Sequence, residues 1–431
     1  MSDSYLFVLV AIAMGGSYVG RWLHRCVVRF PPHYSLRDQL TSVWQEGDCR
    51  SCHTWESGLQ HVPLIGWLIA GRCRSCNRKM DARRPVVELL TGLVLAGLYW
   101  VEIPDFGSFV VENSGLWTGR KPSGPEAIEQ LWSPIVWLHL RYLLHAVLLC
   151  GLIVATVIDF ELCIIPDGCT IPAMIFSVLF SFAVGQTWLT PVWFQDPSTV
   201  RIQKQIIPEA FHFILFEWDA VAFSVSHPHW HGLLVSLAGL FMGAAVTWCI
   251  RAIGFLVLKK EAMGDGDVVL MALIGAVLGW QPVLVVFFLA PLAAIPFAIG
   301  MWVLRRKQPG PQYFPYGPWL SLSAVILLLG WQAIWPRTTP VFDMGMLLFV
   351  VGTVMMFMMA ALLYFSQLVK RLLGIEEPEL DGDSQWSSAD HLSYYAGERP
   401  DEETGLWSRP QWPGSRSGRG LGPGHDWQNP Q

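Results

Sequence analysis

Long runs of apolar residues alternate with short polar segments along most of the chain. Nine such runs occur, and most approach the roughly 20 residues that a helix needs to cross a bilayer. They cover residues 5–23, 86–104, 139–158, 169–187, 231–258, 268–280, 282–304, 317–335 and 343–365. The pattern predicts an all-α polytopic membrane protein with about 8–9 transmembrane helices. The runs on either side of Gly279 to Pro282 could instead form one bent helix.

Polar segments divide the chain into five expected regions. The first transmembrane helix is expected over 1–23, and it lacks a convincing cleavage site, which favours a retained anchor over a signal peptide. A polar domain over 24–84 precedes a multi-helix membrane core over 85–335, with outward insertions near 105–138 and 188–230. An extra transmembrane helix is expected over 336–373. Residues 374–431 are rich in charged residues, Ser, Gly and Pro, which predicts a disordered tail.

The distribution of Lys and Arg predicts which side of the membrane each loop faces. Segment 24–84 holds ten basic residues against five acidic ones, so the positive-inside rule places it in the cytosol. Alternate crossings then place 159–168, 259–267, 305–316 and the tail on the same side. The charge rule agrees at each of these except 159–168, which carries no Lys or Arg.

Composition supports a lipid bilayer as the solvent. The 431 residues are 52% hydrophobic and only 15% charged, with a mean hydropathy of +0.39, which excludes an ordinary soluble domain. The net charge of −5 averages a basic loop and an acidic tail, so it identifies no charged partner, and no nucleic acid ligand is expected.

Four of the nine cysteines form two identical tetrapeptides, Cys49-Arg-Ser-Cys52 and Cys73-Arg-Ser-Cys76. Two such pairs on the reducing side of a membrane are typical of a structural zinc site with four thiolate ligands. The alternative is two redox pairs or unrelated core cysteines. His53 and His61 could substitute as ligands, although a complete thiolate set makes them unnecessary.

Two aspartates border apolar runs at the predicted cytosolic boundary. Asp159 ends the run from Gly151, and Asp267 begins the run that follows Met263-Gly-Asp-Gly-Asp267. Carboxylates at membrane depth are costly and are candidates for function. If they approach closely they would share one proton, as an aspartic peptidase requires of its general base and general acid. The alternative for Gly-x-Gly-Asp alone is an aspartate at a helix N-cap.

Three other acidic residues near these positions have simpler interpretations. Asp167 follows Ile165-Pro166 and has the pattern of a turn or helix cap. Glu161 and Asp265 are interpreted as solvated boundary charges.

These residues together resemble the type IV prepilin peptidases, a family of leader peptidases and N-methyltransferases. The matching segments are Gly16-Ser-Tyr-Val-Gly-Arg-Trp-Leu-His-Arg25, the stretch from Val62 through both cysteines of the second pair to Glu88, Ile158-Asp159 through Asp167, Glu261 through Asp267, and Tyr316-Gly-Pro-Trp319. The resemblance implies Asp159 and Asp267 as the catalytic pair. It implies Cys49, Cys52, Cys73 and Cys76 as ligands of a structural zinc ion.

The resemblance also implies a substrate, a location and a second activity. The family cleaves the leader from pilin and pseudopilin precursors at the cytosolic face of the bacterial inner membrane. It then methylates the new N-terminus from S-adenosylmethionine. Two hypotheses from other classes remain: a transporter that uses the aspartates for protons or cations, and a catalytically silent assembly factor for pili or secretion. Val269, where the family usually has Lys, favours the latter.

Overall fold

The computed structural model describes most of the chain. The described residues are 3–31, 35–45, 52, 54, 62–77, 79–103, 134–193, 197–215, 218–258, 263–304, 315–373, 399–400 and 407–408. They are almost entirely helical. The described strands, β1 (Arg399–Pro400) and β2 (Trp407–Ser408), have two residues each and pair antiparallel.

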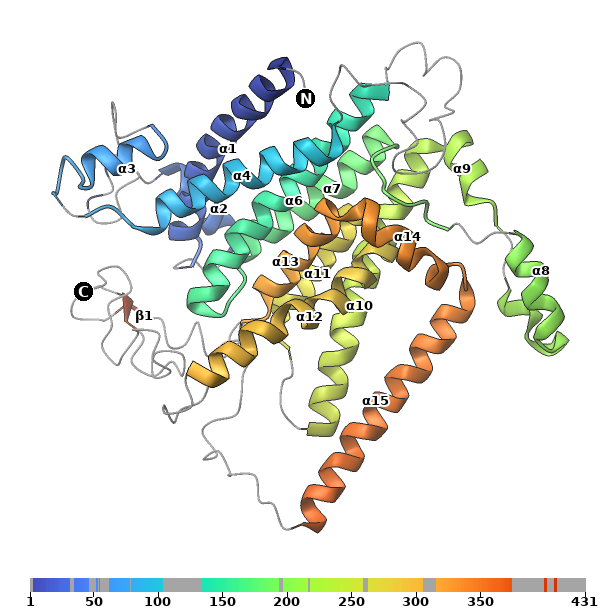
Figure 1. Ribbon diagram of the computed structural model, residues 1–431. Helices are drawn as coiled ribbons and strands as arrows, with labels where there is room; N and C mark the ends of the chain where they lie inside the picture. The colour runs from blue at the N-terminus through green and yellow to red at the C-terminus, as the bar shows by residue number, and fades with distance from the viewer. Residues whose placement is uncertain are drawn as a thin grey trace.

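The long helices (Figure 1) lie over the predicted apolar runs, and several shorter helices lie between them. Their bounds are α1 (Asp3–Arg29), α2 (Leu36–Gln45), α3 (Ile65–Ala70), α4 (Arg83–Glu102), α6 (Pro134–Leu162), α7 (Asp167–Val184), α8 (Pro197–Ile206), the 3-10 helix η3 (Glu209–Ile214), α9 (Ala220–Ser226), α10 (Pro228–Leu258), α11 (Asp265–Leu278), α12 (Trp280–Leu304), α13 (Gly317–Leu329), α14 (Trp331–Phe342) and α15 (Met346–Leu372).

Within the described ranges, seven helices are long and apolar enough to cross a membrane. An eighth crossing is formed if α13 and α14, bent by 100° at Gly330, are one broken span. The prediction of an all-α polytopic membrane protein is therefore confirmed. The ninth expected span is not found, because the run 268–280 becomes α11, whose 14 residues rise only about 21 Å. That is shorter than the roughly 30 Å hydrocarbon core.

α11 lies inside the helical bundle rather than at its surface. It packs along α10 and also contacts α7, α12 and α6 (Figure 1). Every residue from Leu270 to Leu278 is buried. Close approach to α10 requires glycine, because a Cβ on Gly239 would lie 1.9 Å from the carbonyl oxygen of Gly275. A Cβ on Gly243 would lie 2.1 Å from the Met271 carbonyl oxygen, so two small residues set the position of α11.

The other helices surround this centre. α1 packs along α4, and α6 contacts α1, α4, α7 and α13. α15 lies against α10 at the margin of the bundle (Figure 1), and the apolar part of α15 has none of its residues buried. This margin is the surface that lipid would cover.

Several predicted boundaries differ from the observed ones. The first helix continues six residues beyond the expected end at 23, to Arg29, and α2, α3 and a hairpin over 71–80 lie within the expected cysteine domain. Part of the insertion near 188–230 forms α8, η3 and α9. Residues 104–133, 259–262 and 305–314 lie outside the described residues. Most of 374–431 does too, so its disorder stays a prediction.

Candidate active site and metal centre

Asp159 lies in the last turn of α6, and the residue is 5% exposed. The turn is closed by the Cys163 amide, which donates to the Asp159 carbonyl oxygen over 2.9 Å. Cys163 has a φ of +56°, so the helix stops there. A Cβ on Gly317 would lie 2.8 Å from Oδ2 of Asp159. The carboxylate therefore packs directly against the first residue of α13.

Asp267 is the third residue of α11 and is 8% exposed. Its Oδ2 accepts a hydrogen bond of 3.3 Å from the amide of Gly264, which occupies the N-cap position. Asp267 is therefore not the N-cap residue itself, but its carboxylate helps to begin the helix, as an acidic side chain in a first turn does. The glycine contacts between α10 and α11 fix the depth at which this carboxylate lies.

Neighbouring residues at the start of α13 lie near each of the two carboxylates. Gly317 packs against Asp159, and its neighbour Tyr316 lies close enough to Asp267 to interact with its charge. Burial, together with the Asp267 charge, raises the pKa of Tyr316 to about 12. The phenol therefore stays protonated near neutral pH and can donate a hydrogen bond. Sequence reasoning recognised the Tyr316 motif but gave this side chain no role.

Two acidic residues interpreted as solvated are exposed, with side chains 51% (Asp265) and 40% (Glu161) accessible, and they also pair with arginines. Asp265 forms an ion pair with Arg251 of α10, and Glu161 forms one with Arg83 of α4. In each case the arginine lies on a different helix from its acidic partner, so the residues adjacent in sequence do not indicate the ion pair. Asp167 begins α7, but the N-cap position belongs to Pro166, so the predicted side-chain cap is not formed at that position.

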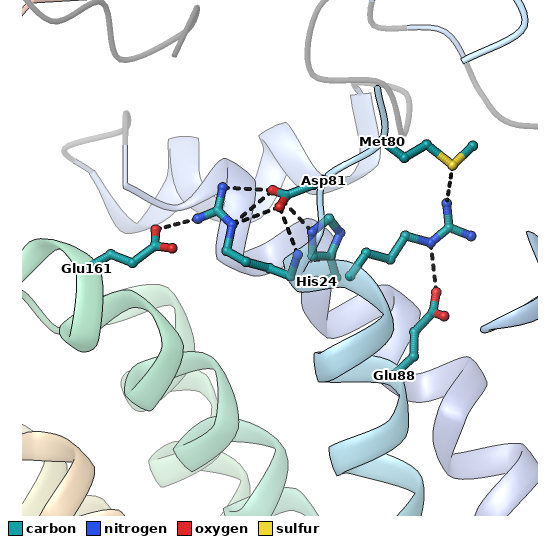
Figure 2. Close-up of polar contacts among 7 residues, drawn as sticks. His24, Met80, Asp81, Glu88 and Glu161 are labelled. Carbon is teal, nitrogen blue, oxygen red and sulfur yellow. Dashed lines mark hydrogen bonds and ion pairs between the residues drawn. The ribbon is translucent and has the colours of Figure 1, made fainter. Parts of the chain in front are cut away.

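Figure 2 shows the polar contacts that surround Arg83. Its Nε donates to both carboxylate oxygens of Asp81, at 2.9 and 3.0 Å, and Nη2 lies 2.7 Å from Asp81 Oδ2. His24 of α1 lies 3.5 Å from the same carboxylate. Burial raises the pKa of Asp81, but hydrogen bonds from His24 and Arg83 outweigh it and hold the pKa well below its usual range. Asp81 is therefore ionised at neutral pH.

A second buried pair lies beside this network. Arg84 Nε donates to Oε1 of Glu88 over 2.8 Å (Figure 2). The Leu64 amide donates to Oε2 of Glu88 over 2.6 Å. Glu88 is completely buried, and the two contacts satisfy both of its oxygens. The pair ties the segment before α3 to α4.

Three of the four predicted metal ligands lie together. The Sγ atoms of Cys52, Cys73 and Cys76 are within 4.8 Å of one another, and Cys52 and Cys73 are 3.7 Å apart. A disulfide would require about 2.05 Å. Four thiolates at about 2.3 Å from one zinc ion are about 3.8 Å apart in a tetrahedron. The cluster therefore fits a zinc ion.

The fourth predicted ligand lies outside the described residues. Cys49, His53 and His61 all fall there, so their participation stays a prediction. Cys73 and Cys76 lie on the hairpin 71–80, which is closed by the Met80 amide donating to the Gly71 carbonyl oxygen over 3.0 Å. A CxxC turn on a short hairpin is a common way to present two thiolates to one ion.

The fold and the buried carboxylates define a multi-helix membrane protein with a candidate acid–base site. Two family models match the chain. The bacterial peptidase A24 N-terminal domain covers residues 14–102, and the type IV leader peptidase family covers 184–299. Both matches indicate that the chain is similar to the type IV leader peptidase family. Asp267 and the four cysteines lie within the matched segments, whereas Asp159 lies between them.

Curated relatives agree with this placement. The chain is 27% identical over 288 residues to a prepilin leader peptidase/N-methyltransferase of Aeromonas salmonicida (strain A449), covering 66% of this chain and 72% of the relative. It is 26% identical over 333 residues to a type 4 prepilin-like proteins leader peptide-processing enzyme of Escherichia coli O78:H11, covering 73% and 91%. No solved structure is significantly similar to the chain.

Proposed function

We propose that the chain is a membrane aspartic endopeptidase that removes the leader peptide from type IV prepilin-like or pseudopilin precursors. The catalytic residues are Asp159 and Asp267. The observation that carries the proposal is that both carboxylates, from different motifs, are buried beside the first residues of α13. The names of the curated relatives support the substrate class.

The chemistry follows from what two adjacent carboxyl groups can do. One carboxylate takes a proton from a water molecule, which attacks the scissile carbonyl carbon, while the protonated partner donates to the carbonyl oxygen. As the C–N bond of the tetrahedral intermediate breaks, the carboxyl group that took the water proton gives it to the amide nitrogen, and the other carboxylate takes back a hydroxyl proton. Tyr316 remains protonated and can donate a hydrogen bond beside Asp267.

The cysteine cluster supports the fold in this proposal. Cys52, Cys73 and Cys76, with Cys49, would hold a structural zinc ion, which stabilises a short segment that lacks a large core of its own. Zinc ligands of a closed four-thiolate site leave no open position for substrate, so no chemical step is assigned to the ion.

N-methylation of the new N-terminus is the second proposed activity. It rests on the names of relatives, which describe an N-methyltransferase, and on the match to the A24 N-terminal domain. S-adenosylmethionine is the proposed methyl donor. No residue of this chain is assigned to bind it.

The proposed location is the bacterial inner membrane, with the carboxylates and cysteines on the cytosolic side. The ten basic residues of segment 24–84 support this orientation. The ends of α4, α6, α11 and α13 that carry Arg83, Glu161, Asp267 and Gly317 meet at one end of the bundle, so one orientation serves both sites.

Similarity to the two peptidase family models favours the peptidase over the two other hypotheses. A transporter would also bury aspartates, but both family models describe peptidase domains. Val269 still distinguishes this chain from the usual family pattern, which is the feature that favours a silent assembly factor. A direct cleavage assay separates the three.

The test is co-expression of the chain with a pilin-like precursor from the same organism. Wild type, Asp159→Asn and Asp267→Asn are compared, and the mass of the product N-terminus is read. The proposal expects a shortened product with wild type alone, with the mass of one methyl group added if methylation occurs. Intact precursor with wild type, in membranes that contain the protein, refutes the proposal.

A further inference from the structure

The last turn of α6 carries two carboxylates at the negative end of a helix. Asp159 and Glu161 both lie in this turn, which contains no basic residue of its own. Carboxylates are disfavoured there by the helix dipole, so a cation from another helix stabilises the turn. Arg83 of α4 supplies it through the ion pair with Glu161 (Figure 2).

Arg83 is itself held in a fixed orientation. Asp81 accepts from both the Nε and the backbone amide of Arg83, the latter over 3.0 Å, and also pairs with Nη2. A guanidinium held in this way on one side presents its remaining Nη1 in one direction, towards Glu161. The side chains of Arg83 and Glu161 are 26% and 40% exposed, so water screens part of this contact.

The chain that leads into this contact comes from the cysteine hairpin. Met80 closes the hairpin 71–80 through its amide, and Asp81 follows directly. Asp81, Arg83 and Glu161 therefore connect the base of the hairpin to the turn that bears Asp159. On its other side Asp159 is packed against Gly317, and the Arg83–Glu161 contact is a tether on the side that faces the hairpin.

We propose that Arg83 is a positioning residue that, held by Asp81 at the base of the cysteine hairpin, fixes the last turn of α6 through Glu161 and so sets the position of the Asp159 carboxylate. This inference rests on the proposed catalytic role of Asp159. It predicts an effect on the chemical step rather than on substrate binding, because Arg83 acts through Glu161 and not on the precursor.

The test is steady-state cleavage of a precursor by purified wild type, Arg83→Gln, Arg83→Lys, Glu161→Gln and the Arg83→Gln/Glu161→Gln double variant. A displacement of about 1 Å costs on the order of 10²-fold in rate, so loss of one tether is expected to lower kcat about tenfold. KM stays within about twofold. Arg83→Lys restores part of kcat, and the double variant is no slower than the slower single variant.

Glu102→Gln provides the matched control. Glu102 lies at the other end of α4 and also forms an acid–base contact with α6, through His145. It should leave kcat unchanged even if it lowers stability. Rates are normalised to folded protein measured by thermal unfolding, so a variant that merely folds less does not imitate the expected result.

Three results distinguish the positioning role of Arg83 from the catalytic role of Asp159. A tenfold lower kcat that is shared by the single and double variants supports positioning. Wild-type kcat in Arg83→Gln, with Asp159→Asn inactive, overturns the positioning role and leaves the peptidase assignment intact. Normal cleavage by Asp159→Asn overturns both.

Discussion

The carboxylate pair and the cysteine cluster lie at the same end of the molecule but are built differently. Asp159 and Asp267 are 108 positions apart in sequence and come from separate helices, whose approach depends on the glycines of α10 and on the start of α13. Cys73 and Cys76 lie on one short hairpin, and a few local hydrogen bonds hold them. Damage to global helix packing should therefore affect the carboxylates, whereas loss of a metal should affect the hairpin first.

Removal of the metal ligands should give the largest effect on stability, and it should be local. Structural zinc contributes on the order of 10 kcal/mol in small zinc-binding peptides. Cys73→Ser, or treatment of wild type with a zinc chelator, is expected to expose the amides of 71–80 to hydrogen exchange while α10 and α11 stay protected. Cleavage should fall far less than in the Asp159→Asn variant.

Cys249→Ser is the control for this experiment, because Cys249 lies on α10 and is not part of the cluster. It should retain the metal content of wild type. Exchange that spreads to α11 on chelation would show that the two regions are not separate folding units.

A methyl group on Gly239 should disturb the carboxylate pair and leave the cysteine hairpin unchanged. Its Cβ would lie 1.9 Å from the Gly275 carbonyl oxygen, so α10 and α11 must separate. Overpacking of this kind costs roughly 1–3 kcal/mol. Gly239→Ala is expected to lower the melting temperature and the cleavage rate, with the zinc content unchanged.

Gly97→Ala is the matched substitution for Gly239→Ala. Gly97 is also in a helix, but nothing lies within 4 Å of its added Cβ. Because alanine favours a helix over glycine, this variant should be as stable as wild type or slightly more so. Equal effects of the two substitutions contradict the account of α10 and α11 packing.

Acid should weaken the ion pair of Asp81 with Arg83, which lies between the cysteine hairpin and the last turn of α6. The folded-state pKa of Asp81 lies below its ordinary value of 3.8, so its stabilising contribution is present above that value and lost as the pH falls below it. The contribution is on the order of 1 kcal/mol. Between pH 6 and pH 3, wild type is expected to lose more unfolding free energy than Asp81→Asn. Parallel pH profiles would falsify the assigned role of this ion pair.

Loss of the Tyr316 hydroxyl should give the smallest effect of the set. The phenol stays protonated and lies near Asp267. One net hydrogen bond of about 1 kcal/mol corresponds to about fivefold in rate. Tyr316→Phe is expected to lower kcat by that factor with little change in KM or melting temperature. An unchanged kcat removes Tyr316 from the site.

The sequence predicted the parts of the molecule that depend on local patterns. The apolar runs located the membrane helices, because a run of about 20 apolar residues is typical of a membrane-spanning helix. The repeated Cys-x-x-Cys brought Cys52, Cys73 and Cys76 together as expected. The two motif aspartates are both buried at one end of the bundle.

The features that sequence reasoning missed depend on packing between distant segments. Glu161 and Asp265 were interpreted as solvated, and both side chains are exposed, but their ion pairs were missed because nothing near them in sequence shows that Arg83 and Arg251 lie within reach. The run 268–280 satisfied the hydropathy criterion for a span, yet α11 is short and enclosed by other helices. Hydropathy reports that a segment avoids water and does not distinguish lipid from protein as its surroundings.

The central claim is that Asp159 and Asp267 act as one catalytic pair. Its most direct test is the cleavage rate of Asp159→Asn, Asp267→Asn and the double Asn variant, measured in membranes that contain equal amounts of folded protein. Loss of either member of a pair that works as a unit removes nearly all of the rate, so the account predicts that both single variants are as inactive as the double. Wild-type cleavage by either single variant would contradict it.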